Sequence, residues 1–183
     1  MPGKADKPTQ NSAIQGISEQ ENFMIRVLFI CHGNICRSTM AESVLTHMVA
    51  VRGLASQFEI DSAATSREEI GNPPHCGTRN KLAQEGIPLI PHKARQMQQE
   101  DYDYYDYLIG MDSANIRNMT RIAGGADPDQ KIYKLLSFAD YAKHQQLVEA
   151  ADVADPWYTG DFDATYRDII AGCQGFLEYL GYK

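Results

Sequence analysis

Apolar residues gather in four short runs along the chain, and longer mixed segments separate these runs. Residues 25–31 are almost all apolar, which is typical of a parallel strand buried on both faces. Three further runs predict strands at residues 58–62, 107–111 and 131–135. Strands that alternate with helical segments indicate right-handed crossovers, so the pattern predicts an α/β fold built on a parallel sheet.

The segments between the strands carry apolar residues at helical spacing. They predict helices at residues 38–52, 75–84, 113–122 and 161–180. Gly53 suits the end of the first helix, and Asp112 suits the N-cap of the third. The tyrosine-rich residues 101–107 predict a surface turn with half-buried rings, and only a short helix is expected near residues 141–147.

Length and composition favour one enzyme-sized domain. The chain has 183 residues, a net charge of −7 and a pI near 5.2. This surplus of acidic groups opposes broad binding to nucleic acid or to an anionic membrane surface. Residues 1–22 are polar and are expected to form a flexible extension, with a short first helix as the alternative, whereas residues 23–183 form the domain.

The four cysteines are expected to remain free thiols. No apolar run reaches the ~18 residues of a membrane span, and residues 1–22 lack the apolar core of a secretion signal. A cytoplasmic location is therefore predicted, where disulfides are uncommon. A zinc site at Cys31 and Cys36 is disfavoured because no C-x2-C pair accompanies them, and no metal or cofactor is expected.

The most informative stretch joins the first predicted strand to the first predicted helix. It reads Cys31-His32-Gly33-Asn34-Ile35-Cys36-Arg37-Ser38. A strand that ends in a tight loop and opens a helix directs several backbone N–H groups at one point, which is the geometry of an anion cradle. The loop formed by residues 32–37 is therefore predicted to bind a phosphate.

The side chains of this loop have complementary uses. Cys31 stands beside a helix N-terminus and a guanidinium, which stabilise a thiolate, and a thiolate is a strong nucleophile. Arg37 offers a planar fork of donors that matches two phosphate oxygens. Asn34 tolerates a positive φ, and Gly33 has no Cβ to block a ligand. The alternative is a chance pattern in which Cys31 is an ordinary buried cysteine at the end of a strand.

Residues 27–42, read as V-L-F-I-C-H-G-N-I-C-R-S-T-M-A-E, resemble the signature of the low-molecular-weight protein tyrosine phosphatases. The similarity continues through residues 60–66, 70–74, 92–96, 110–112 and 155–158. It implies a single three-layer domain, doubly wound, with a four-stranded parallel sheet flanked by helices. It also implies hydrolysis of phosphotyrosine on proteins through a phosphocysteine intermediate, without a metal or cofactor.

The resemblance also assigns roles to single residues. Cys31 would attack phosphorus, Arg37 would clamp the phosphate, and Asp155 would act as general acid and base. A supporting set would hold the loop and the thiolate, and it comprises Asn34, Ser38 and His92. On the sequence alone, Asp155 is an acid in a turn-forming loop beside two aromatic residues, and most acids in such loops are solvated or cap a helix.

The rim of the predicted pocket is where this chain departs from the family. Relatives often carry an aromatic residue where this sequence has Arg67 and Glu68. Trp157 and Tyr158, which follow the Asp155 loop, are the remaining candidates for stacking on a substrate ring. We therefore predict that Trp157 carries most of the ring recognition and that the charged pair contacts side chains flanking the phosphotyrosine.

Two cysteines in one curled loop also suggest redox chemistry. The Cα atoms of Cys31 and Cys36 are expected to approach within the ~7 Å that a disulfide tolerates. Mild peroxide is then predicted to give a reversible disulfide that protects the nucleophile from over-oxidation. The alternative is that Cys36 is simply a small core residue.

Two other functions are compatible with the loop. A thiol-dependent arsenate reductase resembles this fold, but it needs further cysteines close to the nucleophile, and Cys76 and Cys173 are not a close pair in sequence. A phosphotyrosine-binding module without turnover should have lost its nucleophile or its acid, and both are present. The expected partners are phosphotyrosine-containing proteins, with a cognate tyrosine kinase as a further possibility.

Overall fold

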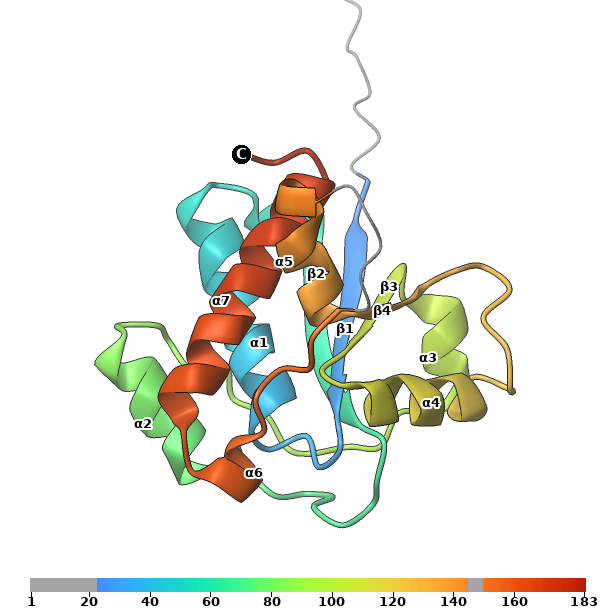
Figure 1. The fold of residues 1–183 in the computed structure, drawn as a ribbon, viewed down its shortest axis with the longest axis horizontal. Coiled ribbons are helices and arrows are strands. Elements are labelled where there is room, and N and C mark those ends of the chain that lie inside the picture. Colours follow the sequence, from blue (N-terminus) through green and yellow to red (C-terminus); the bar gives the residue numbers. More distant parts are fainter. Residues whose placement is uncertain (1–22, 145–149) are drawn as a thin grey trace, which may run out of the picture.

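The computed structural model describes residues 23–144 and 150–183. Its centre is a sheet of four parallel strands in the order β2-β1-β3-β4 (Figure 1). The strands are β1 (Ile25–Cys31), β2 (Phe58–Ala64), β3 (Tyr107–Gly110) and β4 (Ile132–Lys134). The four predicted strands and the parallel sheet are confirmed, whereas the extension predicted for residues 1–22 lies outside the described residues.

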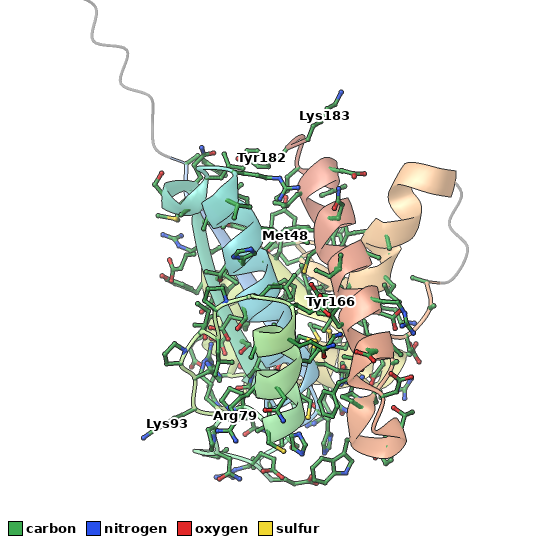
Figure 2. The ribbon with its side chains drawn as sticks, turned by 90° about the vertical axis from the view of Figure 1, so that its left-hand side faces the viewer. Met48, Arg79, Lys93, Tyr166, Tyr182 and Lys183 are labelled. Atoms are coloured by element: carbon green, nitrogen blue, oxygen red, sulfur yellow. The ribbon has the colours of Figure 1, made fainter. Side chains whose placement is uncertain are left out.

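Helices cover both faces of this sheet and make three layers. The helices are α1 (Arg37–Val51), α2 (Cys76–Gln84), α3 (Gln99–Tyr104), α4 (Ser113–Ile122), α5 (Leu135–His144), α6 (Pro156–Thr159) and α7 (Phe162–Tyr179), with a 3-10 turn η1 (Ala55–Gln57). On one face α1, α5 and α7 pack together, and Figure 2 views α1, α2 and α7 from outside. The other face carries α3 and α4.

The central strand β1 explains why both faces need a cover. Val27 and Phe29 belong to the core beneath α1 and α7, whereas Leu28 and Ile30 belong to the core beneath α3 and α4. All four side chains are completely buried. Alternate residues of a strand point to opposite faces, so a strand buried on both sides reads as one continuous apolar run.

The strand order places a binding crevice at the carboxyl end of β1. The chain leaves β1 toward β2 on one side, and later returns to place β3 on the other side of β1. In open parallel sheets ligands bind where the order reverses in this way, beyond the carboxyl ends of the strands. Cys31 is the last residue of β1, so it lies at this point.

The structure corrects the prediction in three places. Residues 99–104 form α3 instead of a surface turn, and Tyr102 and Tyr105 are buried, whereas Tyr104 is half-exposed as expected. A helix, α5, begins directly after β4 at Leu135 instead of near residue 141, and residues 145–147 of that expected helix lie outside the described residues. The loop after Asp155 contains the short helix α6. None of the helices in residues 23–144 and 150–183 combines the length and apolar character needed to cross a bilayer.

Candidate active site

The loop of residues 31–38 closes tightly between β1 and α1 because Asn34 adopts a left-handed conformation. Its φ is 59°, a value that most side chains disfavour and that asparagine tolerates. This turn lets the backbone N–H of Asn34 point back at Cys31 Sγ, 3.3 Å away. The positive φ expected for Asn34 is therefore present in the structure.

Asn34 is completely buried, and its side chain is fixed by four hydrogen bonds. Nδ2 donates to Ser38 Oγ and to Ser62 Oγ, each at 2.9 Å. Oδ1 accepts from His92 Nε2 at 2.7 Å and from the backbone N–H of Arg95 at 3.1 Å. Two of the predicted supporting residues, Ser38 and His92, thus contact the third directly.

Cys31 has the surroundings that a reactive thiolate needs. Cys31 is only 3% exposed, and its Sγ lies 3.1 Å from Ser38 Oγ. A hydroxyl and a backbone N–H can both donate to a negatively charged sulfur, and α1 begins only a few residues further on. The structure therefore brings the predicted nucleophile together with two donors that favour its charged form.

Arg37 is buried at the N-terminus of α1, and its guanidinium contacts the carboxylates of two acids. Nη1 contacts Asp112 Oδ2 at 2.7 Å, and Nη2 contacts Asp155 Oδ2 at 2.9 Å. Burial acts to lower the pKa of Arg37, but the negative charges of Cys31, Asp112 and Asp155 outweigh burial and raise it. Arg37 therefore stays charged, and its fork is aligned before any ligand arrives.

Asp155 reaches the loop because it caps a short helix. Its Oδ1 accepts the backbone N–H of Trp157 at 3.1 Å, and Pro156 occupies the first turn of α6. Asp, Asn, Ser and Thr favour this capping position, and proline suits the first helical residue. The cap leaves Oδ2 free to face Arg37, so Asp155 and the phosphate loop share one pocket although they are far apart in sequence.

The pocket has an anionic wall, formed by Glu68 and Glu69, and an aromatic wall, formed by Trp157 and Tyr158. It is lined by Cys31, His32, Gly33, Ile35, Cys36, Arg37, Glu68, Glu69, Asp155, Trp157 and Tyr158. His32 Nε2 lies 3.1 Å from Glu68 Oε2, so an ion pair joins the loop to the anionic wall when the imidazole is protonated. Of the predicted rim residues, Glu68, Trp157 and Tyr158 line the pocket and Arg67 does not. Glu69, which was not predicted, lines it as well.

The aromatic wall is exposed. Trp157 is 61% exposed and Tyr158 is 84% exposed, although both line the pocket. The ring of Trp157 makes an edge contact with His75, and His75 in turn stacks on Phe162 at the start of α7. The Trp157 ring is thus supported on one side and open to a ligand on the other.

A match to a protein family decides how this pocket is interpreted. Residues 26–183 match the model of the family described as low molecular weight phosphotyrosine protein phosphatase. The chain belongs to this family. The predicted phosphatase resemblance and fold class are therefore confirmed, and with them the expectation of a protein-tyrosine phosphatase.

Individual relatives cover most of the phosphatase domain. The low molecular weight protein-tyrosine-phosphatase YfkJ of Bacillus subtilis is 43% identical over 154 residues, which span 84% of this chain and 94% of the relative. The human low molecular weight phosphotyrosine protein phosphatase is 37% identical over 154 residues, 83% of this chain and 93% of the relative. The crystal structure of YfkJ superposes with a TM-score of 0.78 at 40% identity, and it covers 86% of this chain and 95% of its own.

A further solved relative has a different printed activity. The Drosophila arginine phosphatase DARP superposes on this phosphatase with a TM-score of 0.73 at 30% identity, over 85% of this chain and 98% of its own. Its fold matches nearly as well as that of YfkJ, and its coverage is as complete. The fold alone therefore does not select the phosphorylated side chain, and the pocket walls must do so.

Some residues of the phosphatase site were not foreseen from the sequence. Asp112 was expected only as a helix cap, yet it both caps α4 and orients Arg37. The sequence alone indicates no role for Ser62 or Glu42. In the structure Ser62 Oγ accepts a hydrogen bond from Asn34 Nδ2 and donates one to Glu42 Oε2 at 2.5 Å. The signal for Glu42 is its place one helical turn after Ser38, on the apolar face of α1.

Cys36 differs from Cys31 in its electrostatics. Burial, together with the charges of Cys31 and Asp155, raises the pKa of Cys36 to about 12. This thiol is therefore protonated when the pocket is at rest, and it does not compete with Cys31 as the nucleophile. The Cys31–Cys36 disulfide stays a prediction, and the high pKa implies that it forms by slow attack of Cys36 on an oxidised Cys31.

Proposed function

We propose that this chain hydrolyses phosphotyrosine monoesters on proteins through a phosphocysteine intermediate. The observation that carries the proposal is the shared contact of Arg37, which lies beside Cys31 and pairs with Asp155 in one pocket. Nucleophile, anion clamp and proton donor are the three parts that phosphoryl transfer from an aryl ester needs. Proteins that carry phosphotyrosine are accordingly the expected partners, and a cognate kinase stays a prediction.

In the first step the thiolate of Cys31 attacks phosphorus. A bond forms between Sγ and phosphorus while the bond from phosphorus to the phenolic oxygen breaks. The electron pair of the broken bond goes to the phenolic oxygen, which takes a proton from the carboxyl of Asp155. Arg37 and the backbone N–H groups of the loop hold the phosphoryl oxygens in line with the attack.

The ion pair between Arg37 and Asp155 places the acid next to the bound phosphate. Without substrate, Asp155 Oδ2 lies 2.9 Å from Arg37 Nη2. A phosphate held by the same guanidinium therefore lies beside Asp155, so that the carboxyl is within reach of the leaving oxygen.

In the second step water releases the phosphate. Asp155, now a carboxylate, removes a proton from a water molecule that attacks phosphorus, and the bond between phosphorus and Sγ breaks. The electron pair returns to sulfur, where Ser38 Oγ and the N–H of Asn34 stabilise the thiolate. The cycle consumes one water and leaves inorganic phosphate and the original enzyme.

The direct test is turnover of para-nitrophenyl phosphate and of a phosphotyrosine peptide, with and without a chelator. We expect activity in both conditions, since no step requires a metal. Cys31→Ser should abolish turnover because a neutral hydroxyl is a far poorer nucleophile than a thiolate. Cys76→Ser changes an exposed cysteine on α2 and is the matched control. Cys31→Ser activity within tenfold of wild type, with an unchanged melting curve, would rule out the covalent mechanism.

A second candidate substrate is phosphoarginine, because of the anionic wall. Glu68 and Glu69 face the pocket and could receive a guanidinium, and the relative DARP is an arginine phosphatase by name. Ile35 on the same lining is apolar and suits an aromatic ring better than a cation. We therefore expect kcat/KM for a phosphotyrosine peptide to exceed that for the matched phosphoarginine peptide, and the reverse order would reassign the substrate.

The two earlier alternatives have less structural support. In an arsenate reductase a second cysteine must reach the modified thiol, yet Cys173 on α7 is completely buried in the core and does not line the pocket. Cys76 is exposed on α2 and does not line the pocket. A binding module without turnover would not need Asp155 and Arg37 to be paired within reach of the nucleophile.

A further inference from the structure

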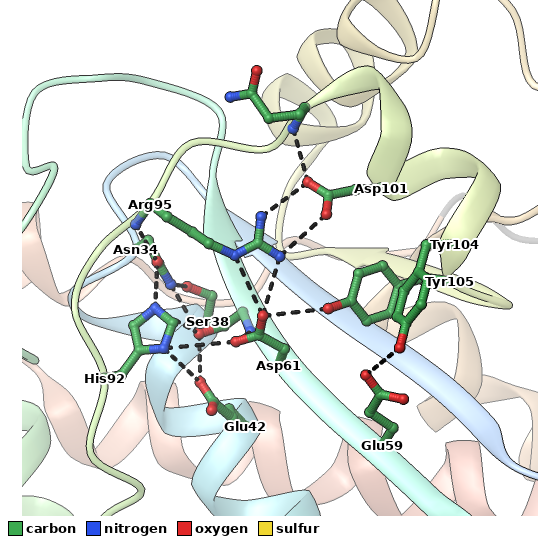
Figure 3. Close-up of polar contacts among 12 residues, drawn as sticks. Asn34, Ser38, Glu42, Glu59, Asp61, His92, Arg95, Asp101, Tyr104 and Tyr105 are labelled. Atoms are coloured by element: carbon green, nitrogen blue, oxygen red, sulfur yellow. Dashed lines mark hydrogen bonds and ion pairs between the residues drawn. The ribbon is translucent and has the colours of Figure 1, made fainter.

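Neighbouring segments hold the phosphate loop, residues 31–38, in place. The side chain of Asn34 ties the loop to His92 and Arg95 (Figure 3). Backbone N–H groups of other segments bind carbonyl oxygens of the loop: Thr65 binds Cys31, Ser66 binds His32, and His75 binds Ile35. The carbonyl of Cys36 differs from these, because side chains bind it as well.

Two threonine hydroxyls converge on the carbonyl oxygen of Cys36. Thr39 Oγ1 donates to it at 3.1 Å from the first turn of α1, and Thr78 Oγ1 donates at 3.3 Å from α2. The backbone N–H of Met40 is a third donor, at 3.1 Å. Both threonines are buried. Three donors thus meet on an oxygen that has two lone pairs, so one hydroxyl can replace the other.

The carbonyl of Cys36 and the N–H of Arg37 belong to the same planar peptide group. In a trans peptide these two bonds point in opposite directions, and no cis peptide bond occurs in the described residues. Cys36 and Arg37 line the pocket, whereas Thr39 and Thr78 do not. A carbonyl that is directed at the two threonines therefore turns the N–H of Arg37 toward the pocket.

The N–H groups at this end of α1 are available to an anion. Cys36 is the N-cap residue of α1, but its side chain makes no capping hydrogen bond within the described part of the chain. The first N–H groups of a helix have no partner inside the helix, and they form a site for anions. The N–H of Arg37 is the first of them, and the guanidinium of the same residue binds phosphate oxygens.

We propose that Thr39 and Thr78 are positioning residues of the phosphate site. Together they hold the peptide group between Cys36 and Arg37 so that its N–H faces the bound phosphoryl group. Neither hydroxyl touches the substrate, because both act through the Cys36 carbonyl. A donor that is already oriented need not turn when the charge arrives, and this is how preorganised groups stabilise an oxyanion. The inference rests on the phosphate binding that belongs to the proposed function.

The test measures binding of inorganic phosphate to the full chain by calorimetry, which needs no turnover. Valine keeps the branched shape of threonine without its hydroxyl. Thr39→Val and Thr78→Val should each weaken phosphate only about two- to threefold, because the remaining hydroxyl still serves the carbonyl. The double variant should lose more than about tenfold, which exceeds the product of the single losses.

NMR of single backbone amides distinguishes a positioning role from a structural one. Phosphate should move the amide proton of Arg37 downfield in wild type, because this N–H donates to a charged oxygen. The change should be smaller in Thr78→Val and smallest in the double variant. Gly33 is the internal control, since the N–H of Ser66 holds its peptide group through the carbonyl of His32. Its amide should respond to saturating phosphate as in wild type.

Two further variants serve as controls. Thr78→Ser keeps a hydroxyl, so its combination with Thr39→Val should bind phosphate as Thr39→Val alone does. Thr120→Val removes a hydroxyl that donates to the Ile116 carbonyl within α4 at 2.9 Å, and it should bind phosphate as wild type. Melting curves verify folding.

Three results would overturn the positioning role. They are a double variant that binds phosphate within twofold of wild type, an Arg37 amide that responds in Thr78→Val as in wild type, and an affinity loss in Thr120→Val equal to that in Thr78→Val. The second result applies even where the double variant does not fold. A wild-type chain that binds phosphate but hydrolyses no phosphate monoester would instead contradict the proposed function alone.

Discussion

Arg37 illustrates how much one side chain determines in this site. Its two terminal nitrogens pair with acids from separate segments, Asp112 at the start of α4 and Asp155 at the start of α6. These pairs orient the guanidinium before substrate arrives, which reduces the entropy that is lost when Arg37 binds the phosphate. A side chain with a single charged nitrogen cannot satisfy both acids and a phosphate in one plane.

We therefore predict that Arg37→Lys loses most phosphatase activity although the charge is kept. Loss of one bidentate clamp should reduce kcat/KM by about 10²–10³-fold, the range seen when one preorganised donor to an oxyanion is removed. Steady-state kinetics with para-nitrophenyl phosphate measure this, and a melting curve verifies folding. A loss below tenfold would mean that the loop backbone alone binds the phosphate.

Trp157 is the residue on which recognition of the substrate ring is expected to depend. It lines the pocket, and its ring makes an edge contact with His75. Stacking of aromatic pairs contributes about 0.5–1.5 kcal/mol, so Trp157→Ala should lower kcat/KM for phosphotyrosine peptides about three- to tenfold. A small alkyl phosphate should be affected much less, and equal loss on both substrates would instead assign Trp157 to the positioning of Asp155.

At the scale of elements, the four strands and the helices α1, α2, α4 and α7 were predicted, whereas the short helices α3 and α6 were not. The strands β1 to β3 and the helix α7 carry enough apolar periodicity to be identified locally. The helix α3 is only six residues long, and it depends on the Asp101 carboxylate, which caps its start and binds Arg95. The helix α6 depends in the same way on Asp155. Tertiary and capping contacts that fix such short helices leave little periodic signal.

The α6 cap yields a prediction about the general acid. Asn and Asp are equally good N-caps, so Asp155→Asn should keep α6 while removing the ionisable proton. Cleavage should then slow most for substrates with basic leaving oxygens, such as phosphotyrosine, and least for activated aryl esters. Pre-steady-state rates over a leaving-group series measure this dependence. A uniform loss across the series would point to a structural role for Asp155.

At the scale of the whole molecule, the contiguous part of the site was predictable and the dispersed part was not. Residues 31–38 carry the loop chemistry in one stretch, so spacing and residue type were enough to identify it. Glu42, Asp61 and Arg95 act together only because α1, β2 and the segment before α3 meet at one edge of the sheet. Local patterns contain no information on such meetings, and a glutamate in an amphipathic helix is usually on the solvated side.

Glu42 therefore links the buried network to the stability of the entire fold. It is 3% exposed in the core side of α1, and burial raises its pKa from 4.5 to about 7. The folded chain thus binds more protons at this group than the unfolded chain between these two pH values. The sign follows directly: the contribution of Glu42 is fully present below pH 4.5 and is lost as the pH rises toward 7.

The corresponding prediction compares wild type with Glu42→Gln, which cannot titrate at this position. The free energy of unfolding of wild type should fall relative to the variant by about 2–3 kcal/mol between pH 5 and pH 8. His92 titrates in both proteins, so most of its effect cancels in the difference. Urea unfolding at several pH values measures this, with Glu59→Gln as the surface control. If the difference in free energy of unfolding between wild type and Glu42→Gln stays constant with pH, Glu42 remains charged in the folded protein. The proton between Glu42 and His92 would then belong to His92.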